Sequence, residues 1–304
     1  MTNLMSRVAS APISWGICEV PGWGAMLPTA RVLDEMASLG LPATELGAPG
    51  FLPADPEALK AELAEFDMTL IGGFTPLVLH DRGRRESTIV SAKAAAALFQ
   101  RAGASEFVSA VVMDDGWSVP RALDVDEMHH LIEMLGVIDE ICNAHGLQQV
   151  LHPHVQTLVE TASDVQRVFD SCDVKWCLDT GHLAIGGVDP VAFARQSADR
   201  VGHVHLKDVN MSMAGAVLRH EVSIMSGVQS GLFTPLGQGD VDISTVIETL
   251  EHAGYGGWYV IEQDTAITGA LPDAGAGPIT CVAQSLAYLR DVVAPRLEPK
   301  LAKS

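Results

Sequence analysis

The stretch VKWCLDTGHLAIGGVDPVAFARQSADRVGHVHLKDV, residues 174–209, contains two short apolar runs separated by an amphipathic segment. The runs, residues 174–180 and 202–209, have the length and the β-branched character of buried strands. The segment between them, residues 189–200, begins with an aspartate at the position of a helix cap and spaces its apolar residues as a helix does. Two strands joined through a helix are expected to run parallel, because such a crossover returns the chain in the same direction.

The same unit recurs along the rest of the chain. Strand-like runs are found at residues 7–15, 43–47, 68–74, 106–113, 148–155, 174–180, 202–209 and 258–264. Helical stretches follow them at residues 28–40, 56–66, 88–103, 125–146, 161–172, 189–200, 242–254 and 279–293. In a chain of 304 residues this alternation predicts one α/β domain, a (β/α)8 TIM barrel over residues 1–304. The alternative is an open doubly wound sheet, but the loop APISWGICEVPGWG (11–24) lacks the G-x-G-x-x-G pattern of such folds.

The composition argues against nucleic-acid and membrane partners. With 38 Asp and Glu against 19 Lys and Arg, the formal net charge is −19 at pH 7, which disfavours phosphate polymers and anionic membrane surfaces. No apolar run approaches the ~18 residues of a membrane span, and the first residues lack the apolar core of a secretion signal, so a cytoplasmic protein is expected. The five cysteines form no C-x-x-C pair and are expected to be buried, reduced thiols: Cys18, Cys142, Cys172, Cys177 and Cys281.

Titratable residues that interrupt apolar runs are concentrated at the ends of the last four predicted strands. In this class of barrel, the groups that carry the chemistry lie at the carboxyl ends of the strands. Taking one residue from each strand gives the set His152, Asp179, His205 and Glu262. Such a set would enclose one divalent ion, and its mixture of imidazole and carboxylate suits Mn²⁺, Co²⁺, Fe²⁺ or Zn²⁺. The alternative is that these histidines are hydrogen-bonded core residues.

Three further residues near these positions are candidates for acid–base chemistry. A divalent ion on a carbonyl oxygen lowers the barrier to removing the neighbouring proton, and a neutral histidine or a desolvated lysine can then act as base or acid. His182 and Lys207 suit these roles, and His154 is a second candidate base. The alternatives are that Lys207 pairs with Asp208 or another carboxylate at the rim and that His182 caps the following helix.

The longest connection, residues 209–242, follows the seventh strand and is expected to form a loop over the active site. Arg219 and His220 in this loop could reach a polar substrate, although a solvated surface position is the alternative for both. The other wall is expected to come from the first loop and the ends of the second and third strands: Trp15, Glu19, Trp23, Glu45, Phe74 and His80. Alternatively, Trp15 or Trp23 could pack across the end of the barrel without contacting a substrate. The predicted substrate-binding residues are Trp15, Glu45, His80 and Arg219.

Several longer stretches resemble the sugar isomerase and epimerase superfamily of xylose-isomerase-like TIM barrels. They are CLDTGHLAIGGVDP (177–190), HVHLKDV (203–209) and FTPLGQGDVDISTVIETLEHAGYGGWYVIEQD (233–264). Two stretches look most similar to inosose dehydratases of inositol catabolism: LHPHVQTLVET (151–161) and AVLRHEVSIMSGVQSGLFTPLGQGDVD (216–242). The resemblance implies one divalent metal on strands five to eight, with His152 in place of the family's first glutamate. It also implies that His182 of the D-T-G-H motif lies near the substrate.

The resemblance implies a lyase that dehydrates a keto-cyclitol such as 2-keto-myo-inositol, by removing an α-proton and a β-hydroxyl group, with Mn²⁺ or Co²⁺ as the metal. The partner is then a small polyhydroxylated ketone, and the number of subunits stays open, a homo-oligomer included. Histidine at position 152 removes a carboxylate that epimerases use as ligand and base, which favours elimination. The loop SWGICEVPGWG (14–24) departs from the W-T-N-D-D loop of inosose dehydratases, so a related cyclitol or keto-sugar is an alternative substrate. Alternative functions are a keto-sugar isomerase or epimerase, a lyase acting on a 3-keto-glycoside, and a non-catalytic sugar-binding barrel.

Overall fold

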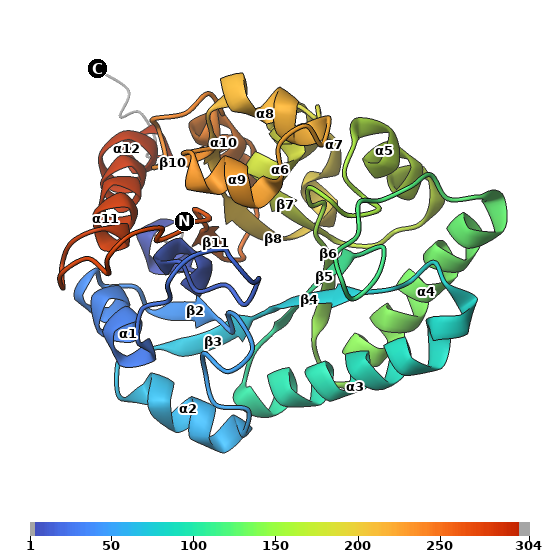
Figure 1. Ribbon diagram of the computed structural model, residues 1–304, viewed down its shortest axis with the longest axis horizontal. Helices are drawn as coiled ribbons and strands as arrows, with labels where there is room; N and C mark the ends of the chain where they lie inside the picture. Colours follow the sequence, from blue (N-terminus) through green and yellow to red (C-terminus); the bar gives the residue numbers. More distant parts are fainter. Residues whose placement is uncertain (1–3, 298–304) are drawn as a thin grey trace, which may run out of the picture.

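The computed structural model describes residues 4–297, and within them nine parallel strands form one sheet that curves into a barrel (Figure 1). The strands are β1 (Val8–Ser10), β2 (Ala43–Glu45), β3 (Thr69–Gly72), β4 (Phe74–Leu77), β5 (Glu106–Val111), β6 (Gln148–Leu151), β7 (Trp176–Asp179), β8 (Val201–Leu206) and β11 (Tyr259–Ile261). Their hydrogen-bonded order is β3-β2-β1-β11-β8-β7-β6-β5-β4. The first and last strands are neighbours, because Val8 of β1 lies opposite Tyr259 of β11.

The barrel closes at Gly73, where the predicted third strand divides into β3 and β4. The amide of Leu46 donates to the carbonyl of Gly72 at 3.0 Å, and the amide of Val108 donates to the carbonyl of Gly73 at 3.2 Å. The carbonyl of Gly72 therefore bonds to the residue that follows β2, and the next carbonyl, that of Gly73, bonds to β5 on the opposite side. A Cβ atom at Gly73 would lie 2.8 Å from the ring of Phe99 and 2.9 Å from the Cβ of Leu46, so this bend requires glycine. Together, β3 and β4 take the place of one strand in an eight-stranded barrel, which confirms the (β/α)8 prediction.

Helices cover the outside of the barrel, as Figure 1 shows, and each of the eight predicted helical stretches is helical. Several of them begin with a side-chain cap: the Asp124 carboxylate accepts from the amide of Glu127 at the start of the helix over residues 125–144. The helices that begin at Thr29, Arg85 and Pro278 have no such cap. The outer helices are α1 (Thr29–Ser38), α2 (Pro56–Ala64), α3 (Arg85–Ala102), α4 (Val125–Ala144), α5 (Ala162–Ser171), α7 (Pro190–Ser197), α10 (Ile243–His252) and α11 (Pro278–Tyr288), which continues through a π-turn (Leu289–Val293) into α12 (Ala294–Leu297).

Most of the strands are shorter than the sequence predicts, the first and the fifth among them. The first ends at Ser10, and a 3₁₀ turn (Pro12–Trp15) replaces its second half, because proline offers no amide hydrogen to continue the ladder. Other 3₁₀ turns are Leu4–Arg7, Arg82–Arg84 and Ala198–Arg200. The fifth strand ends at Leu151, so the residues that follow it lie on a loop rather than on the expected strand.

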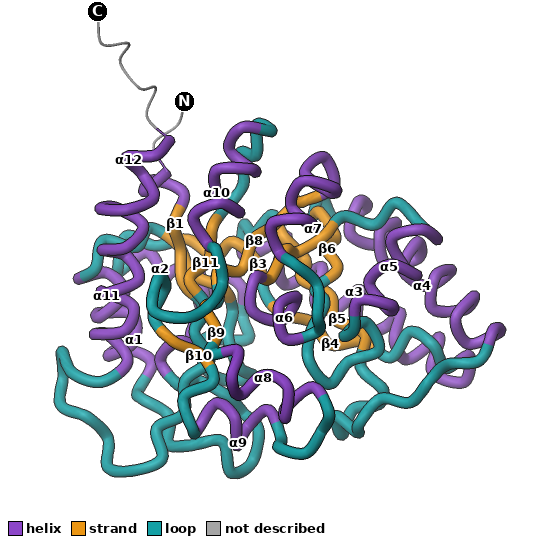
Figure 2. Tube along the Cα trace, turned by 90° about the horizontal axis from the view of Figure 1, so that it is seen from above, coloured by secondary structure: helices purple, strands orange, loops and turns teal. Residues whose placement is uncertain are grey.

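Residues 209–242, the long loop, cross one end of the barrel together with other loops (Figure 2). The long loop contains α8 (Met211–Leu218) and α9 (Ile224–Gln229), and a short antiparallel ladder of β9 (Asp208–Val209) with β10 (Phe233–Thr234) holds its base. The buried carboxylate of Asp208 accepts hydrogen bonds from the amides of Gly237 at 2.8 Å, Gly239 at 2.9 Å and Val241 at 3.0 Å. These bonds fix the returning end of the long loop.

All five cysteines lie within the described range and are free thiols; Cys142 and Cys177 are buried as predicted, whereas Cys18, Cys172 and Cys281 are half-buried. Burial raises the pKa of the Cys142 and Cys177 thiols to about 12, so both stay protonated at neutral pH. Among residues 4–297, no helix has the length and apolar content that crossing a membrane would require. The predicted domain also includes residues 1–3 and 298–304, which lie outside the described part of the chain.

Candidate active site

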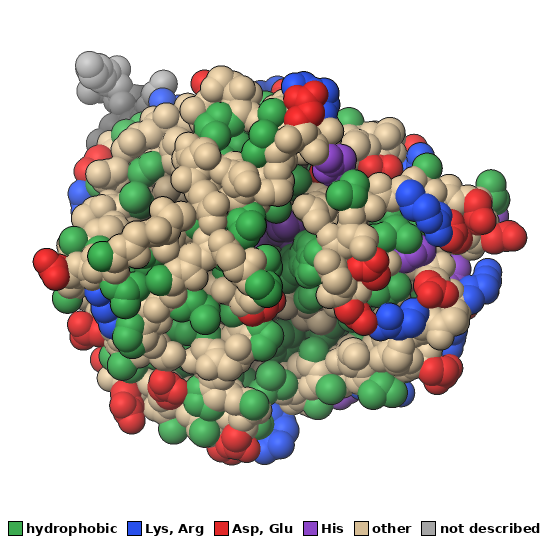
Figure 3. Space-filling model, viewed as in Figure 1, with side chains coloured by type: hydrophobic (Ala, Val, Ile, Leu, Met, Phe, Trp, Pro, Cys, Tyr) green, Lys and Arg blue, Asp and Glu red, His purple; other side chains and the backbone are tan. Residues whose placement is uncertain are grey.

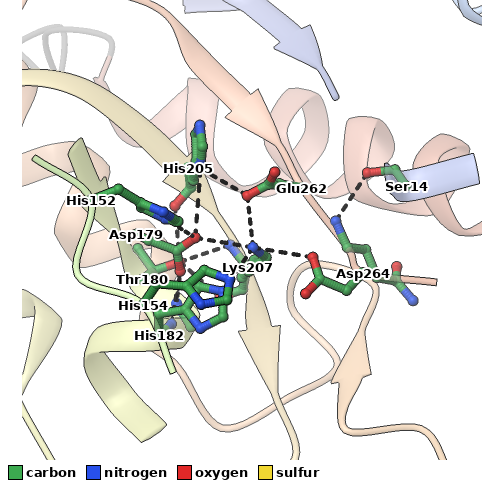
Figure 4. Close-up of polar contacts among 12 residues, drawn as sticks. Ser14, His152, His154, Asp179, Thr180, His182, His205, Lys207, Glu262 and Asp264 are labelled. Atoms are coloured by element: carbon green, nitrogen blue, oxygen red, sulfur yellow. Dashed lines mark hydrogen bonds and ion pairs between the residues drawn. The ribbon is translucent and has the colours of Figure 1, made fainter. Parts of the chain in front are cut away.

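The four predicted metal ligands come together at the carboxyl ends of four neighbouring strands (Figure 4). Asp179 ends β7, His205 belongs to β8, and the other two follow β6 and β11 directly. One side-chain nitrogen or oxygen from each lies within 4.8 Å of those of the others. All four side chains are buried. We call this group the ligand cluster: His152, Asp179, His205 and Glu262.

Asp179 divides its two oxygens between a helix and the ligand cluster. Its Oδ1 accepts from the amides of Gly181 at 2.9 Å and His182 at 2.8 Å, which caps the short helix α6 (Thr180–Ile185). Its Oδ2 lies 3.1 Å from Nε2 of His152 and 3.2 Å from Nζ of Lys207. The start of α6 therefore holds Oδ2 towards the centre of the cluster.

The chemistry of the cluster fits a divalent cation. Nδ1 of His205 lies 2.7 Å from Oε2 of Glu262 and 3.7 Å from Oδ2 of Asp179, yet this buried nitrogen has no hydrogen-bond partner among residues 4–297. Burial would lower the pKa of His205, but the acidic groups around it raise that pKa well above its usual value, so without an ion the ring itself carries a positive charge. A divalent ion between Nδ1 and the two carboxylates would take the place of the Nδ1 proton. Imidazole and carboxylate donors are the ligands that Mn²⁺, Co²⁺ and Zn²⁺ accept.

Lys207 lies at the edge of the cluster and contacts three carboxylates. Its Nζ is 2.7 Å from Oε2 of Glu262, 3.1 Å from Oδ1 of Asp264 and 3.2 Å from Oδ2 of Asp179 (Figure 4). Burial would lower the pKa of Lys207, but the three carboxylates outweigh it and raise that pKa well above its usual value. Lys207 is therefore an ammonium ion. Of the alternatives for Lys207, pairing with Asp208 is wrong, because that carboxylate binds the amides of the long loop, whereas pairing with other carboxylates is confirmed.

Glu262 and Asp264 both contact Lys207, but their pKa values shift in opposite directions. Burial would raise the pKa of Glu262, but His205 and Lys207 together lower it to about 2. At Asp264 burial prevails over the attraction of Lys207 and raises the pKa to about 6. Glu262 is thus ionised at neutral pH, and Asp264 is the carboxyl group of the site that is protonated most readily.

His154 and His182 form a stacked pair beside the cluster, with ring centroids 3.8 Å apart. Burial is the main cause that lowers both pKa values, that of His154 to about 3 and that of His182 well below its usual value. Both rings are therefore neutral at pH 7. Nδ1 of His154 donates to the carbonyl of Val155 at 2.6 Å, and its Nε2 has no hydrogen-bond partner in the described chain. In His182, Nδ1 lies 3.3 Å from the amide nitrogen of Val155 and Nε2 lies 3.1 Å from Nζ of Lys207. Both neighbours are donors, so the neutral ring accepts a hydrogen bond from one of them, according to its tautomer.

Aromatic rings border the histidines. Phe74, a predicted wall residue, has its ring centroid 5.7 Å from that of His152 and 5.6 Å from that of His154. Trp117 stacks on Phe74 at 6.0 Å and lies 5.6 Å from His154. Trp117 was not among the residues predicted from the sequence, although its place in the turn-rich loop after the fourth barrel strand was a usable signal. Phe233 of the long loop, also missed, lies 5.9 Å from His182.

Most of the predicted substrate-binding residues are not brought to the ligand cluster. Trp15 is fully buried in the core and its indole donates to Glu35 at 2.9 Å. His80 is buried beyond β4, and burial lowers its pKa. Arg219 is exposed and pairs with Glu221 at 2.8 Å. Glu45 does reach the cluster, because its Oε1 lies 2.8 Å from Nε2 of His205, a cluster member, and 2.8 Å from Nε2 of His203.

The remaining candidates of the first and long loops take other positions. The indole of Trp23 donates to the carbonyl of Thr265 at 2.8 Å and packs under the long loop. Nε2 of His220 lies 3.7 Å from Oε2 of the buried Glu160, in the loop that follows β6. The space-filling view in Figure 3 shows a hollow in the centre of this face, with a histidine inside it and apolar side chains around it.

The chain matches known proteins over most of its length. Residues 33–292 match the model of a family described as xylose isomerase-like TIM barrel. The chain is 33% identical over 278 residues to an inosose dehydratase of Geobacillus kaustophilus, covering 86% of this chain and 89% of that protein. It is 32% identical over 280 residues to the rhizopine catabolism protein MocC of Rhizobium meliloti, covering 89% and 85%. The crystal structure of the IolI protein with a bound zinc atom has the same fold, with a TM-score of 0.68 and 14% identity over 95% of this chain and 98% of that one.

Proposed function

The chain belongs to the xylose isomerase-like TIM barrel family, and from that premise we propose that it is a metal-dependent hydro-lyase acting on a keto-cyclitol such as 2-keto-myo-inositol. The reaction removes a proton from the carbon next to the ketone and a hydroxyl group from the following carbon. The products are water and a ring with a carbon–carbon double bond conjugated to the ketone. The relatives named inosose dehydratase support the choice of substrate class.

The observation that carries the proposal is the ligand cluster with a free imidazole nitrogen beside it. The cluster would hold one divalent ion, which we propose to be Mn²⁺ or Co²⁺. When bound, the ion would polarise the ketone oxygen and so acidify the neighbouring C–H bond. The zinc atom belongs to the IolI protein and supports only the idea that this fold can hold a metal.

We assign the base to His154. Donation from its Nδ1 to the carbonyl of Val155 fixes the tautomer, which leaves the lone pair of Nε2 for the α-proton. His182 has a hydrogen-bond donor beside each of its nitrogens, so it is proposed to hold the neighbouring ring and to contact the substrate. Lys207 is an ammonium ion held by three carboxylates, so its proposed role is to donate a hydrogen bond or a proton to the departing hydroxyl group.

The long loop is proposed to cover the substrate. Its Phe233 lies beside His182, and the ammonium of Lys207 lies 5.6 Å from the centre of the same ring. The contact between His220 and Glu160 connects the loop to the segment that follows β6. Phe74 and Trp117 would form the opposite wall, where the apolar face of a sugar-like ring can pack. A reducing compartment such as the cytoplasm is proposed from the five free thiols.

The test is to incubate the protein, stripped of metal and then reloaded with Mn²⁺ or Co²⁺, with 2-keto-myo-inositol. Growth of ultraviolet absorbance from the conjugated product is expected in the loaded sample and not in the stripped one. In heavy water, exchange at the α-carbon without loss of water would contradict the proposal and favour an isomerase or epimerase. Binding of the sugar with neither reaction would indicate a non-catalytic sugar-binding barrel.

A further inference from the structure

Glu45 lies at the end of β2, on the floor of the active site, and a local irregularity in the sheet sets its direction. The pairing of β2 with β3 shifts between Thr44 and Glu45, because Thr44 lies opposite Leu70 while Glu45 lies opposite Gly72. A shift of this kind re-aims the side chain next to it, and such shifts are frequent beside active sites. The Glu45 side chain is 3% exposed, so its carboxylate is inside the barrel.

The carboxylate of Glu45 accepts two hydrogen bonds on a single oxygen. Oε1 lies 2.8 Å from Nε2 of His203 and 2.8 Å from Nε2 of His205. Both histidines belong to β8, two residues apart, so they share one face of that strand. Both are fully buried, and the Nδ1 atom of each has no hydrogen-bond partner among the described residues.

We propose that Glu45 is a positioning residue that fixes the tautomer of His205. This inference rests on the proposed metal site. A proton on Nε2 of His205 is held by the Glu45 carboxylate, so the lone pair of Nδ1 points at the position between Glu262 and Asp179. A carboxylate behind a ligating imidazole also makes the ligand more basic. His203 donates to the same oxygen and thereby keeps the carboxylate in place.

A second metal ion is the competing interpretation of the same atoms. Glu45, His203 and His205 together satisfy the spacing of a three-ligand site. The two distances of 2.8 Å are, however, those of ordinary charge-assisted hydrogen bonds. Protons on the two Nε2 atoms therefore account for the geometry without an ion. The two interpretations differ in stoichiometry, since ours requires one ion per chain.

The test is the variant Glu45→Gln, studied by titration of the metal-free protein with Co²⁺. The amide presents an N–H donor as well as an oxygen, so it no longer holds both Nε2 protons. The variant should bind one Co²⁺ about 10- to 100-fold more weakly than the unmodified protein. The visible absorption bands of the bound Co²⁺ should also change, which a loss of general stability would not cause.

The matched control is Glu106→Gln, a buried carboxylate inside the barrel that bonds Gln148 at 3.1 Å and contacts no member of the ligand cluster. It should keep the Co²⁺ affinity and spectrum. If Glu45→Gln fails to fold, Glu45→Asp is measured instead, and its shorter side chain should also weaken binding.

Unchanged affinity and spectrum in the Glu45 variant would overturn the inference while leaving the metal site intact. Two ions per chain in the unmodified protein would overturn it in favour of the second site. No Co²⁺ binding by the unmodified protein would overturn both the inference and the proposed function.

Discussion

The imidazole rings of His154 and His182 stack with their centroids 3.8 Å apart and their planes inclined by 35°. Two cations at this separation would repel each other strongly, so the pair can carry at most one positive charge near neutral pH. Lys207, at 3.1 Å from Nε2 of His182, adds a permanent positive charge. Repulsion from these charges therefore helps to keep His154 neutral, and so able to accept a proton, close to the cation Lys207.

Changing His154 should alter how stability depends on pH. Burial lowers the pKa of His154 from 6.5 to about 3, so the unfolded chain binds more protons than the folded chain between these values. The free energy of unfolding should thus fall as the pH drops from about 6.5 towards 3, by at most about 1.4 kcal/mol per pH unit from this residue.

The variant His154→Gln should show a shallower fall over that range in urea titrations at successive pH values. It should also lose α-proton removal. His129→Gln, an exposed histidine of α4, is the matched control and should behave like the unmodified protein. Equal slopes in all three proteins would refute the assignment of a depressed pKa.

Removing a ligand should abolish ion binding and activity together. His205→Ala and Glu262→Ala each delete one donor of the ligand cluster, and the charge stabilisation supplied by a metal is worth several kcal/mol. We expect less than one tenth of an ion per chain by elemental analysis and a loss of at least about a thousandfold in kcat/KM. Circular dichroism should show the fold retained. Full activity in either variant would contradict the assignment of these residues as metal ligands.

The anchoring of the long loop by Asp208 should be measurable as stability. Asp208→Ala leaves the amides of Gly237, Gly239 and Val241 without their carboxylate and should lower the free energy of unfolding by about 3 kcal/mol. Asp208→Asn keeps one acceptor oxygen, so its free energy of unfolding in urea should lie between that of Asp208→Ala and that of the unmodified protein. Because the anchored segment follows Phe233, both variants should also raise KM for the substrate. An unchanged midpoint for Asp208→Ala would argue against the anchor.

Two glycine-to-alanine substitutions should change the stability of the protein in opposite directions. Gly73→Ala forces a Cβ against Phe99 and Leu46 and should destabilise the protein by about 1–3 kcal/mol. Gly136→Ala, on the exposed side of α4 with no atom within 4 Å of the added Cβ, should stabilise it by about 1 kcal/mol. Thermal unfolding followed by circular dichroism separates the two. A stabilising Gly73→Ala would contradict the closure described for the barrel.

Sequence patterns predicted the barrel and the ligand cluster because both depend on local signals. Apolar periodicity marks each strand and helix, and polar residues that interrupt it, such as Asp179 and His205, mark the strand ends. Residues whose role depends on distant partners were beyond that method. The bonds from His203 and His205 to Glu45 join positions 158 and 160 residues apart, and no local pattern contains that pairing. The burial of Trp15 follows from the turn that replaces the end of the first strand, where periodicity gives no boundary.

The pairing of β1 with β11 has a consequence for the newly made protein. Ribosomes release the amino-terminal strand first, and its partner, which begins at Tyr259, emerges only near the end of synthesis. A nascent chain stopped before that point has two open sheet edges, at β1 and β8, and also lacks Glu262. Completion of the barrel and completion of the ligand cluster therefore happen in the same late step, and until then the chain offers an ion only three of its four ligands.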